Sequence, residues 1–182
     1  MRIIIDPGHG DDKPGAVYSG VAEKDINLAV ALAMGRMLRD KGHQVLYTRD
    51  RDVNLSLMSR VNMINEFKAD VFISIHCNAS VDHKSNGVEA YYRDALDYGL
   101  ANTIQQALAA RTGLKDRGTH KDILALHKRL TVLDNSEKVP AALIELGFLD
   151  SPDLAYLTGN INTVAEIMAD AVHDYAVKRG MA

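Results

Sequence analysis

Three short and nearly uninterrupted apolar runs constrain the fold of this chain more than any other feature. They lie at residues 2–6 (RIIID), 71–77 (VFISIHC) and 141–147 (AALIELG). A strand with one face in water alternates apolar and polar residues, whereas a strand with both faces covered is apolar almost throughout. The three runs therefore predict buried strands in a sheet that is covered on both sides.

Segments with helical periodicity alternate with these runs. We expect helices where apolar residues recur at helical spacing, at residues 23–41, 55–67, 95–112 and 160–178. Further strands are expected at residues 43–48, 87–92 and 129–133. Strands that alternate with helices of this length are typical of an α/β sheet with helices on both faces. The length of 182 residues suits one such domain, which we predict to span residues 1–182 without a linker.

Charge and composition exclude several classes of protein. The formal net charge is -3. Nucleic-acid binding requires a surplus of Lys and Arg opposite the phosphates, so we expect no nucleic-acid partner. No apolar stretch approaches the roughly 20 residues that span a bilayer, so we expect no membrane insertion and a soluble protein. Cys77 is the only cysteine, which rules out an intrachain disulfide. The first residues lack the long apolar core and cleavage site of a signal peptide.

Polar side chains follow the predicted buried strands at the points where ligands usually bind. In open α/β sheets, binding sites lie beyond the carboxyl ends of the strands. Asp6 and His9 follow the first strand, His76 and Asn78 end the strand at residues 71–77, and Glu145 lies near the end of the last strand. We expect these side chains to converge in space.

Four residues have the chemistry of a hydrolytic metal centre. Catalytic zinc often takes two histidines and one glutamate as ligands and leaves a fourth position for water. His9, Glu23 and His76 would supply such a ligand set, which polarises a carbonyl and makes the bound water more acidic. Glu145 would take the proton of that water and pass it to the departing amine.

Each of these residues also has a purely structural explanation. His9 could belong to a tight loop, Glu23 could stabilise a helix N-terminus, and His76 could be a packed core histidine. The proposed ligands come from distant segments, and no local HExxH-type motif is present. Glu145 differs from them, because an unpaired carboxylate in an apolar strand is costly, which favours a functional role.

The segments around these residues resemble the zinc-dependent N-acetylmuramoyl-L-alanine amidases of the amidase-3 family, which include bacterial autolysins and phage endolysins. The resemblance covers nearly the whole chain. It is carried, in order, by residues 3–10 (IIIDPGHG), Glu23, residues 74–79 (SIHCNA), residues 87–92 (GVEAYY), Arg117-Gly118 and residues 140–149 (PAALIELGFL).

The resemblance implies a fold, a cofactor and a substrate. The fold would be a phosphorylase/hydrolase-like three-layer sandwich, with a mostly parallel six-stranded sheet flanked by helices. One Zn²⁺ would be held by His9, Glu23 and His76, with Glu145 as the catalytic residue. The substrate would be bacterial peptidoglycan, cut between N-acetylmuramic acid and L-alanine. We expect a monomer that acts on the cell wall, either as a phage endolysin released from the cytoplasm or as the catalytic domain of a secreted autolysin.

Some positions depart from the family pattern or have no assigned role. Cys77 replaces the more usual alanine, and we interpret it as a small core residue because an apolar strand end does not stabilise a thiolate. Residues 119–128 match no family pattern. We interpret the remaining histidines as solvated or packing residues rather than ligands; these are His43, His83, His120, His127 and His173. Arg60 and Asn78 either support the site or serve the helix surface and a turn, and Glu89 is left without a role.

Two other functions compete with the amidase. A zinc peptidase that cuts within the stem peptide would use the same four residues in a differently lined cleft. An inactive wall-binding module would keep the fold without turnover, although it would not need the four residues. A nucleotide-binding loop is disfavoured, because residues 6–10 (DPGHG) lack the lysine and the serine or threonine of a P-loop.

Overall fold

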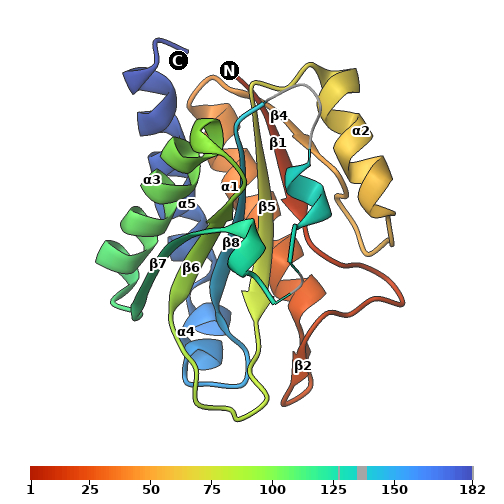
Figure 1. Cartoon of the computed structure of the whole chain (residues 1–182), viewed down its shortest axis with the longest axis vertical. Helices are drawn as coiled ribbons and strands as arrows, with labels where there is room; N and C mark the ends of the chain where they lie inside the picture. The colour runs from red at the N-terminus through yellow and green to blue at the C-terminus, as the bar shows by residue number, and fades with distance from the viewer. Residues whose placement is uncertain (127, 135–138, 182) are drawn as a thin grey trace.

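The computed structural model describes residues 1–126, 128–134 and 139–181, which form a three-layer α/β sandwich (Figure 1). The central sheet has six strands in the order β4-β1-β5-β8-β6-β7. The four strands from β4 to β8 are parallel, whereas β6 runs antiparallel to β8 and parallel to β7. The predicted fold class, with a mostly parallel six-stranded sheet, is therefore confirmed. The strands of this sheet are β1 (Arg2–Pro7), β4 (Gln44–Tyr47), β5 (Val71–Asn78), β6 (Val88–Tyr92), β7 (Asp116–Lys121) and β8 (Ala141–Phe148).

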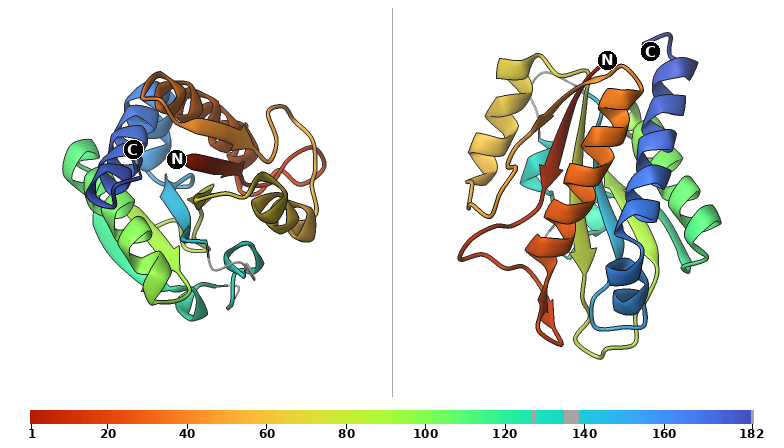
Figure 2. Two further views of the ribbon diagram at one scale, coloured as in Figure 1. Left: turned by 90° about the horizontal axis from the view of Figure 1, so that it is seen from above. Right: turned by 180° about the vertical axis from the view of Figure 1, so that it is seen from behind.

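Helices cover both faces of the sheet. The rear view in Figure 2 shows α1, α3 and α5 on one face, and Figure 1 shows α2 and the 3-10 helix η2 on the other. The helices are α1 (Glu23–Asp40), α2 (Leu57–Phe67), α3 (Ala95–Thr112), α4 (Asp153–Gly159) and α5 (Ile161–Lys178), with 3-10 helices η1 (Asp122–Leu124) and η2 (Thr131–Leu133). None of the helices in the described ranges is long and apolar enough to cross a membrane.

The two covered faces explain the apolar run of β1. Ile3 and Ile5 are fully buried in the larger core, which also contains residues of α1, α3 and α5. Ile4 points to the opposite face, where it packs in a smaller core with Ile64 of α2 and Val132 of η2. Successive side chains of a strand point to opposite faces, and both faces of β1 are covered. All three isoleucines are therefore buried, which explains why the run is apolar throughout.

The prediction of a strand at residues 129–133 is wrong. Thr131–Leu133 forms the 3-10 helix η2, closed by hydrogen bonds from Leu133 N to Leu130 O and from Asp134 N to Thr131 O. Val132 and Leu133 are buried against the core beneath α2, so their apolar character reflects a packed turn rather than a strand. β-branched residues are common in strands, so their presence here favoured a strand. In so short an apolar run, periodicity alone cannot distinguish a strand from a helical turn.

The sixth strand of the sheet is instead β7, which the sequence did not predict. Its residues Asp116–Lys121 are polar (DRGTHK) and only partly buried, because β7 is an edge strand beside β6. The hairpin of β2 (Val17–Tyr18) and β3 (Val21–Ala22) and the short helix α4 were also not predicted. These elements are too short or too polar to have a periodic pattern.

Candidate active site

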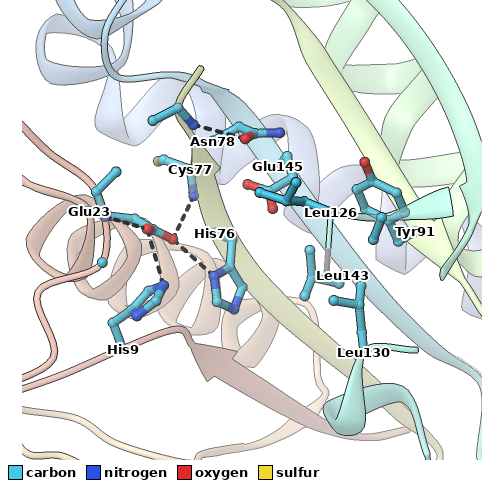
Figure 3. A pocket seen from close by; sticks show the side chains of 14 residues that line it. His9, Glu23, His76, Cys77, Asn78, Tyr91, Leu126, Leu130, Leu143 and Glu145 are labelled. Carbon is cyan, nitrogen blue, oxygen red and sulfur yellow. Dashed lines mark hydrogen bonds and ion pairs between the residues drawn. The ribbon is translucent and has the colours of Figure 1, made fainter. Parts of the chain in front are cut away.

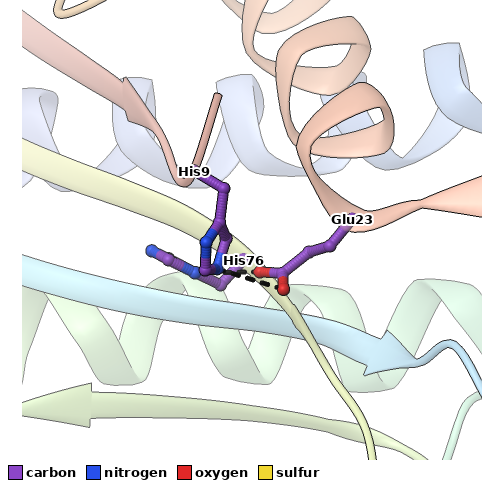
Figure 4. A group of neighbouring side chains, drawn as sticks. All are labelled: His9, Glu23 and His76. Carbon is purple, nitrogen blue, oxygen red and sulfur yellow. Dashed lines mark hydrogen bonds and ion pairs between the residues drawn. The ribbon is translucent and has the colours of Figure 1, made fainter. Parts of the chain in front are cut away.

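His9, Glu23 and His76 come together at the carboxyl ends of β1 and β5, as predicted (Figure 4). His9 Nε2 lies 3.1 Å from Glu23 Oε2, and His76 Nδ1 lies 2.9 Å from Glu23 Oε1. One ligand atom from each residue lies within 4.8 Å of the others. In the described part of the chain, they form the one group of three or more such side chains that could share a metal ion.

Glycines make room for this cluster. A Cβ at Gly8 would overlap the ring of His76, and a Cβ at Gly15 would overlap the carboxylate of Glu23. Gly15 also has a φ of +70°, a conformation that favours glycine. His9 itself has a φ of 63°, which a non-glycine residue adopts at a cost. The backbone of this loop is therefore shaped around the three side chains.

Two buried arginines hold the loop that carries His9. Arg60 donates hydrogen bonds to the carbonyls of Pro7 and His9, both at 2.8 Å, and Arg49 donates to Pro7 at 3.0 Å. Each arginine is only 3% exposed. Arg60 also pairs with Asp6 at 2.7 Å. Asp6, which we expected to converge on the site, lies instead beneath this loop as the buried partner of Arg60.

The carboxylate of Glu23 is surrounded by hydrogen-bond donors. Besides the two histidines, Asn27 Nδ2 and the backbone NH of Cys77 donate to Oε1 at 3.2 and 3.1 Å, and the backbone NH of Ala16 donates to Oε2 at 3.0 Å. Burial would raise the pKa of Glu23, but the hydrogen bonds from His76 and His9 hold it well below its ordinary value. Glu23 is thus maintained as an anion. It begins α1 but makes no side-chain cap for that helix.

Glu145 lies on β8, directly between His76 of β5 and Glu89 of β6 in the sheet register. Its Oε2 atom is buried and has no hydrogen-bond partner among the described residues. Burial raises the pKa of this carboxyl well above its ordinary value, and the nearby charges of Glu23 and Glu89 raise it further. A carboxylate in this environment accepts a proton readily.

All four predicted residues line one hollow of about 370 Å³ (Figure 3). In the view of Figure 3, Glu145 projects between the His9–Glu23–His76 cluster and an opposite wall that is mostly apolar. That wall includes Tyr91, Ala125, Leu126, Leu130 and Leu143. The hollow therefore brings a candidate metal centre and a proton-accepting carboxylate to the same space.

Glu89 and Asn78 belong to a polar network beside Glu145. Asn78 Nδ2 and Tyr91 OH donate to Glu89 Oε1 at 2.8 and 3.1 Å. Arg117 Nε donates to Glu89 Oε2 at 2.8 Å. Glu89 is buried, so these donors compensate a charge that would otherwise be costly. The network supports the wall of the hollow without entering the ligand cluster.

The other described histidines lie outside the ligand cluster, as predicted. His120 Nε2 is 2.7 Å from the carbonyl of Arg117. His43 pairs with His173 at 3.0 Å, and His83 pairs with Asp150 at 2.8 Å. His127 lies outside the described residues. Cys77 is buried, and burial raises the pKa of its thiol well above its ordinary value, which confirms that it is a core residue.

Three contributors to the site were not found in the sequence. Asn27 supports Glu23 from one helical turn further along α1, and its spacing could have indicated this contact. Arg49 binds loop carbonyls, and Tyr91 lines the hollow. Neither has a local signal: the loop carbonyl that Arg49 binds is distant in the sequence, and nothing beside Tyr91 indicates that it faces the hollow.

Residues 3–174 match the Amidase_3 family, described as N-acetylmuramoyl-L-alanine amidase. This chain belongs to that family. It is 35% identical over 180 residues to N-acetylmuramoyl-L-alanine amidase LytC of Bacillus subtilis, a match that covers 96% of this chain and 34% of LytC. It is also 35% identical over 173 residues to the germination-specific amidase of the same organism, covering 86% of this chain and 70% of that protein.

Solved structures of amidases have the same fold. The catalytic domain of CwlV, an N-acetylmuramoyl-L-alanine amidase from Bacillus (Paenibacillus) polymyxa, superposes with a TM-score of 0.87 at 35% identity, covering 96% of this chain and 97% of that one. The amidase AmiC2 of Nostoc punctiforme gives a TM-score of 0.88 at 32% identity, covering 96% of each chain. The chain spans about a third of the length of LytC but almost all of the CwlV catalytic domain.

Proposed function

We propose that residues 1–182 are the catalytic domain of a zinc-dependent N-acetylmuramoyl-L-alanine amidase. Its substrate would be bacterial peptidoglycan, cut at the amide bond between N-acetylmuramic acid and L-alanine. One observation carries this proposal: His9, Glu23 and His76 share a hollow with the buried and incompletely bonded carboxylate of Glu145. Membership of a family of amidases supports the choice of substrate.

The residues of the cluster fit zinc. Two imidazole nitrogens and one carboxylate oxygen are a donor set of catalytic zinc sites. Glu23 keeps its negative charge because the hydrogen bonds described above lower its pKa, and a ligand must be deprotonated. When bound, zinc would supply a Lewis acid that polarises the scissile carbonyl and makes a water molecule more acidic.

Glu145 would move the proton. As the oxygen of water bonds to the carbonyl carbon, Glu145 accepts a proton from that water. It then delivers the proton to the amide nitrogen as the carbon–nitrogen bond breaks. The products are the lactyl carboxylate of the muramic acid and a stem peptide with a free amino group on L-alanine. The raised pKa of Glu145 and its Oε2 atom, which has no hydrogen-bond partner in the described part of the chain, suit both transfers.

The test is hydrolysis of purified peptidoglycan, with zinc content measured on the same preparations of wild type and Glu145→Gln. We expect about one zinc per chain in both proteins and release of whole stem peptides by the wild type alone. Glu166→Gln, an exposed substitution on α5, is the matched control and should behave as wild type. Release of amino acids or peptide fragments would instead identify a peptidase, and binding without cleavage would identify a wall-binding module.

We also propose that the domain acts on the cell wall, in line with the substrate. Its source as a phage endolysin or a secreted autolysin stays a prediction, as does the monomeric state. Size-exclusion chromatography with light scattering would test the latter directly.

A further inference from the structure

A second hollow adjoins the candidate metal centre on its other side. It encloses about 330 Å³ and shares His9 and His76 with the first hollow. The first hollow lies over β5, β8 and β6, whereas the second lies over the end of β1 and the start of α2. Its outer wall is formed by Lys13, Asn54, Leu55, Ser56, Leu57 and Val132. The two histidines therefore stand between two separate spaces.

Glu145 lines the first hollow and not the second, which gives the site a direction. The amide nitrogen must come within hydrogen-bond reach of Glu145 to receive its proton. That nitrogen is about 1.3 Å from the carbonyl carbon, so the two atoms cannot be far apart in the site. The part of the substrate attached to nitrogen would then extend into the first hollow, which Glu145 borders, and the part attached to the carbonyl carbon would extend to the other side of the histidines.

We propose that the two hollows are the two halves of one substrate groove, with the stem peptide in the first and the muramoyl glycan in the second. The inference rests on the proposed amidase function and adds the orientation of the substrate. Leu126 and Leu130 would contact the peptide. Asn54 and Leu57 would contact the N-acetylated sugars.

The charges of the second hollow agree with a neutral ligand. Its lysine and its arginine both have acidic partners: Lys13 Nζ lies 3.4 Å from Asp12, and Arg60 lies 2.7 Å from Asp6. An N-acetylmuramoyl sugar whose lactyl group is in amide linkage is uncharged, unlike a stem peptide with free carboxylates. It offers hydroxyl and amide groups together with an apolar ring face. Asn54 and the 53% exposed side chain of Leu57 match these two kinds of surface.

Two fragments of the substrate provide separate probes. One is a soluble glycan fragment whose lactyl groups are capped as simple amides and so are uncharged, and the other is a free stem peptide that begins with L-alanine. Their binding to zinc-loaded protein is measured by calorimetry for wild type and two double variants, Asn54→Ala/Leu57→Ala and Leu126→Ala/Leu130→Ala. We expect the first variant to weaken glycan binding about tenfold with peptide binding unchanged, and the second to do the reverse. Thermal unfolding verifies that both variants are folded.

A second readout uses turnover. Lengthening the glycan of a muramoyl-peptide substrate should lower KM for the wild type and for Leu126→Ala/Leu130→Ala, but not for Asn54→Ala/Leu57→Ala. The proposed orientation would be overturned if each variant weakened binding of the other probe instead. It would also be overturned if a variant affected both probes equally, or if neither variant had an effect. If the wild type fails to cleave muramoyl-peptides at all, the proposed function itself fails, which is a distinct result.

Discussion

The two sides of the candidate active site handle a buried carboxylate in opposite ways. Glu23, at the start of α1, is surrounded by donors that lower its pKa, so it remains an anion. Glu145, on β8, has a buried oxygen without a partner among the described residues and a raised pKa. The same functional group thus suits the proposed fixed ligand in one place and the proposed proton carrier in the other. The difference comes from the donors that surround Glu23 and from the neighbouring carboxylates that raise the pKa of Glu145 further.

The largest expected effect comes from neutralising Glu145, the proposed proton carrier. Glu145→Gln keeps the shape of the side chain but removes the group that accepts the proton, so we expect turnover to fall by about 10²–10⁴-fold. Zinc content should stay near that of the wild type, because Glu145 is not in the ligand cluster. Rates are measured on purified peptidoglycan beside Glu166→Gln. A variant that retains turnover would contradict the distinction between the two carboxylates.

The same substitution should not destabilise the zinc-free protein. Because the folded-state pKa of Glu145 is raised, the folded protein holds the proton at pH values where the unfolded chain has released it. Wild-type stability therefore falls as pH rises through the window from the ordinary pKa to the raised one. Glu145→Gln lacks this loss, so its unfolding temperature at pH 8 should be at least that of the wild type. A clearly lower value would show that ionised Glu145 stabilises the fold.

For a third buried carboxylate, Asp6, we expect substitution to destabilise the protein, in contrast to Glu145→Gln. Asp6 accepts hydrogen bonds from Arg60, Thr48 and Ser74 at 2.6 to 2.7 Å. Asp6→Ala would leave the buried guanidinium of Arg60 without its acidic partner, so we expect a loss of about 3–5 kcal/mol in the free energy of unfolding. Denaturant unfolding measures this loss. Asp174→Ala, an exposed substitution on α5, is the control and should change little.

A smaller effect is expected from removing the hydrogen bond that Asn27 donates to the proposed ligand Glu23. Asn27→Leu removes the side-chain donor to Oε1 but keeps a similar volume, so we expect zinc affinity to fall by about 10–100-fold. Competition with a chelator of known affinity measures this change. Gln105→Leu is the control, because it removes another fully buried amide that lies on α3 and contacts Asp116. Equal losses in the two variants would point to a general effect on the fold.

The smallest effect concerns a pair remote from both carboxylates. Burial lowers the pKa of His43, and the charges of the N-terminus and His173 lower it further. Between the lowered and the ordinary pKa, the unfolded chain binds a proton that the folded protein does not, so stability falls as the pH decreases through the ordinary pKa of histidine toward the lowered one. His43→Leu should flatten this part of the curve of unfolding temperature against pH. An unchanged slope would show that His43 does not contribute to it.

Two of the candidate site residues, His9 and Glu145, have a distinctive local setting in the sequence, whereas Glu23 and His76 had equally good structural explanations and were singled out by the family resemblance. His9 follows a buried strand in a glycine-rich loop, and Glu145 places a carboxyl group inside an apolar strand. Their supports were not predictable in the same way. Arg49 binds carbonyls that are about forty positions away in the chain, and nothing in its own neighbourhood indicates these contacts.

The prediction of the fold was limited in the same way, because some elements have no signal in their own sequence. The buried strands β1, β5 and β8 were recognised because covering both faces makes every position apolar. The edge strand β7 was missed, because hydrogen bonding to β6 places its polar residues in the sheet without a buried face. At Thr131–Leu133, burial without extended backbone produced the opposite error. A run of apolar residues indicates that a segment is buried. It predicts a strand correctly only where the buried segment also has an extended backbone.

The positions of the chain ends have a consequence for how this domain can be joined to others. Met1 and the end of α5 lie together at one end of the molecule, whereas β1 and β5 deliver His9 and His76 to the other (Figure 1). A tether attached at either chain terminus would leave the candidate active site facing away from the attachment point. Fusion to an anchor or a carrier should therefore be compatible with access by a polymer as large as a glycan strand.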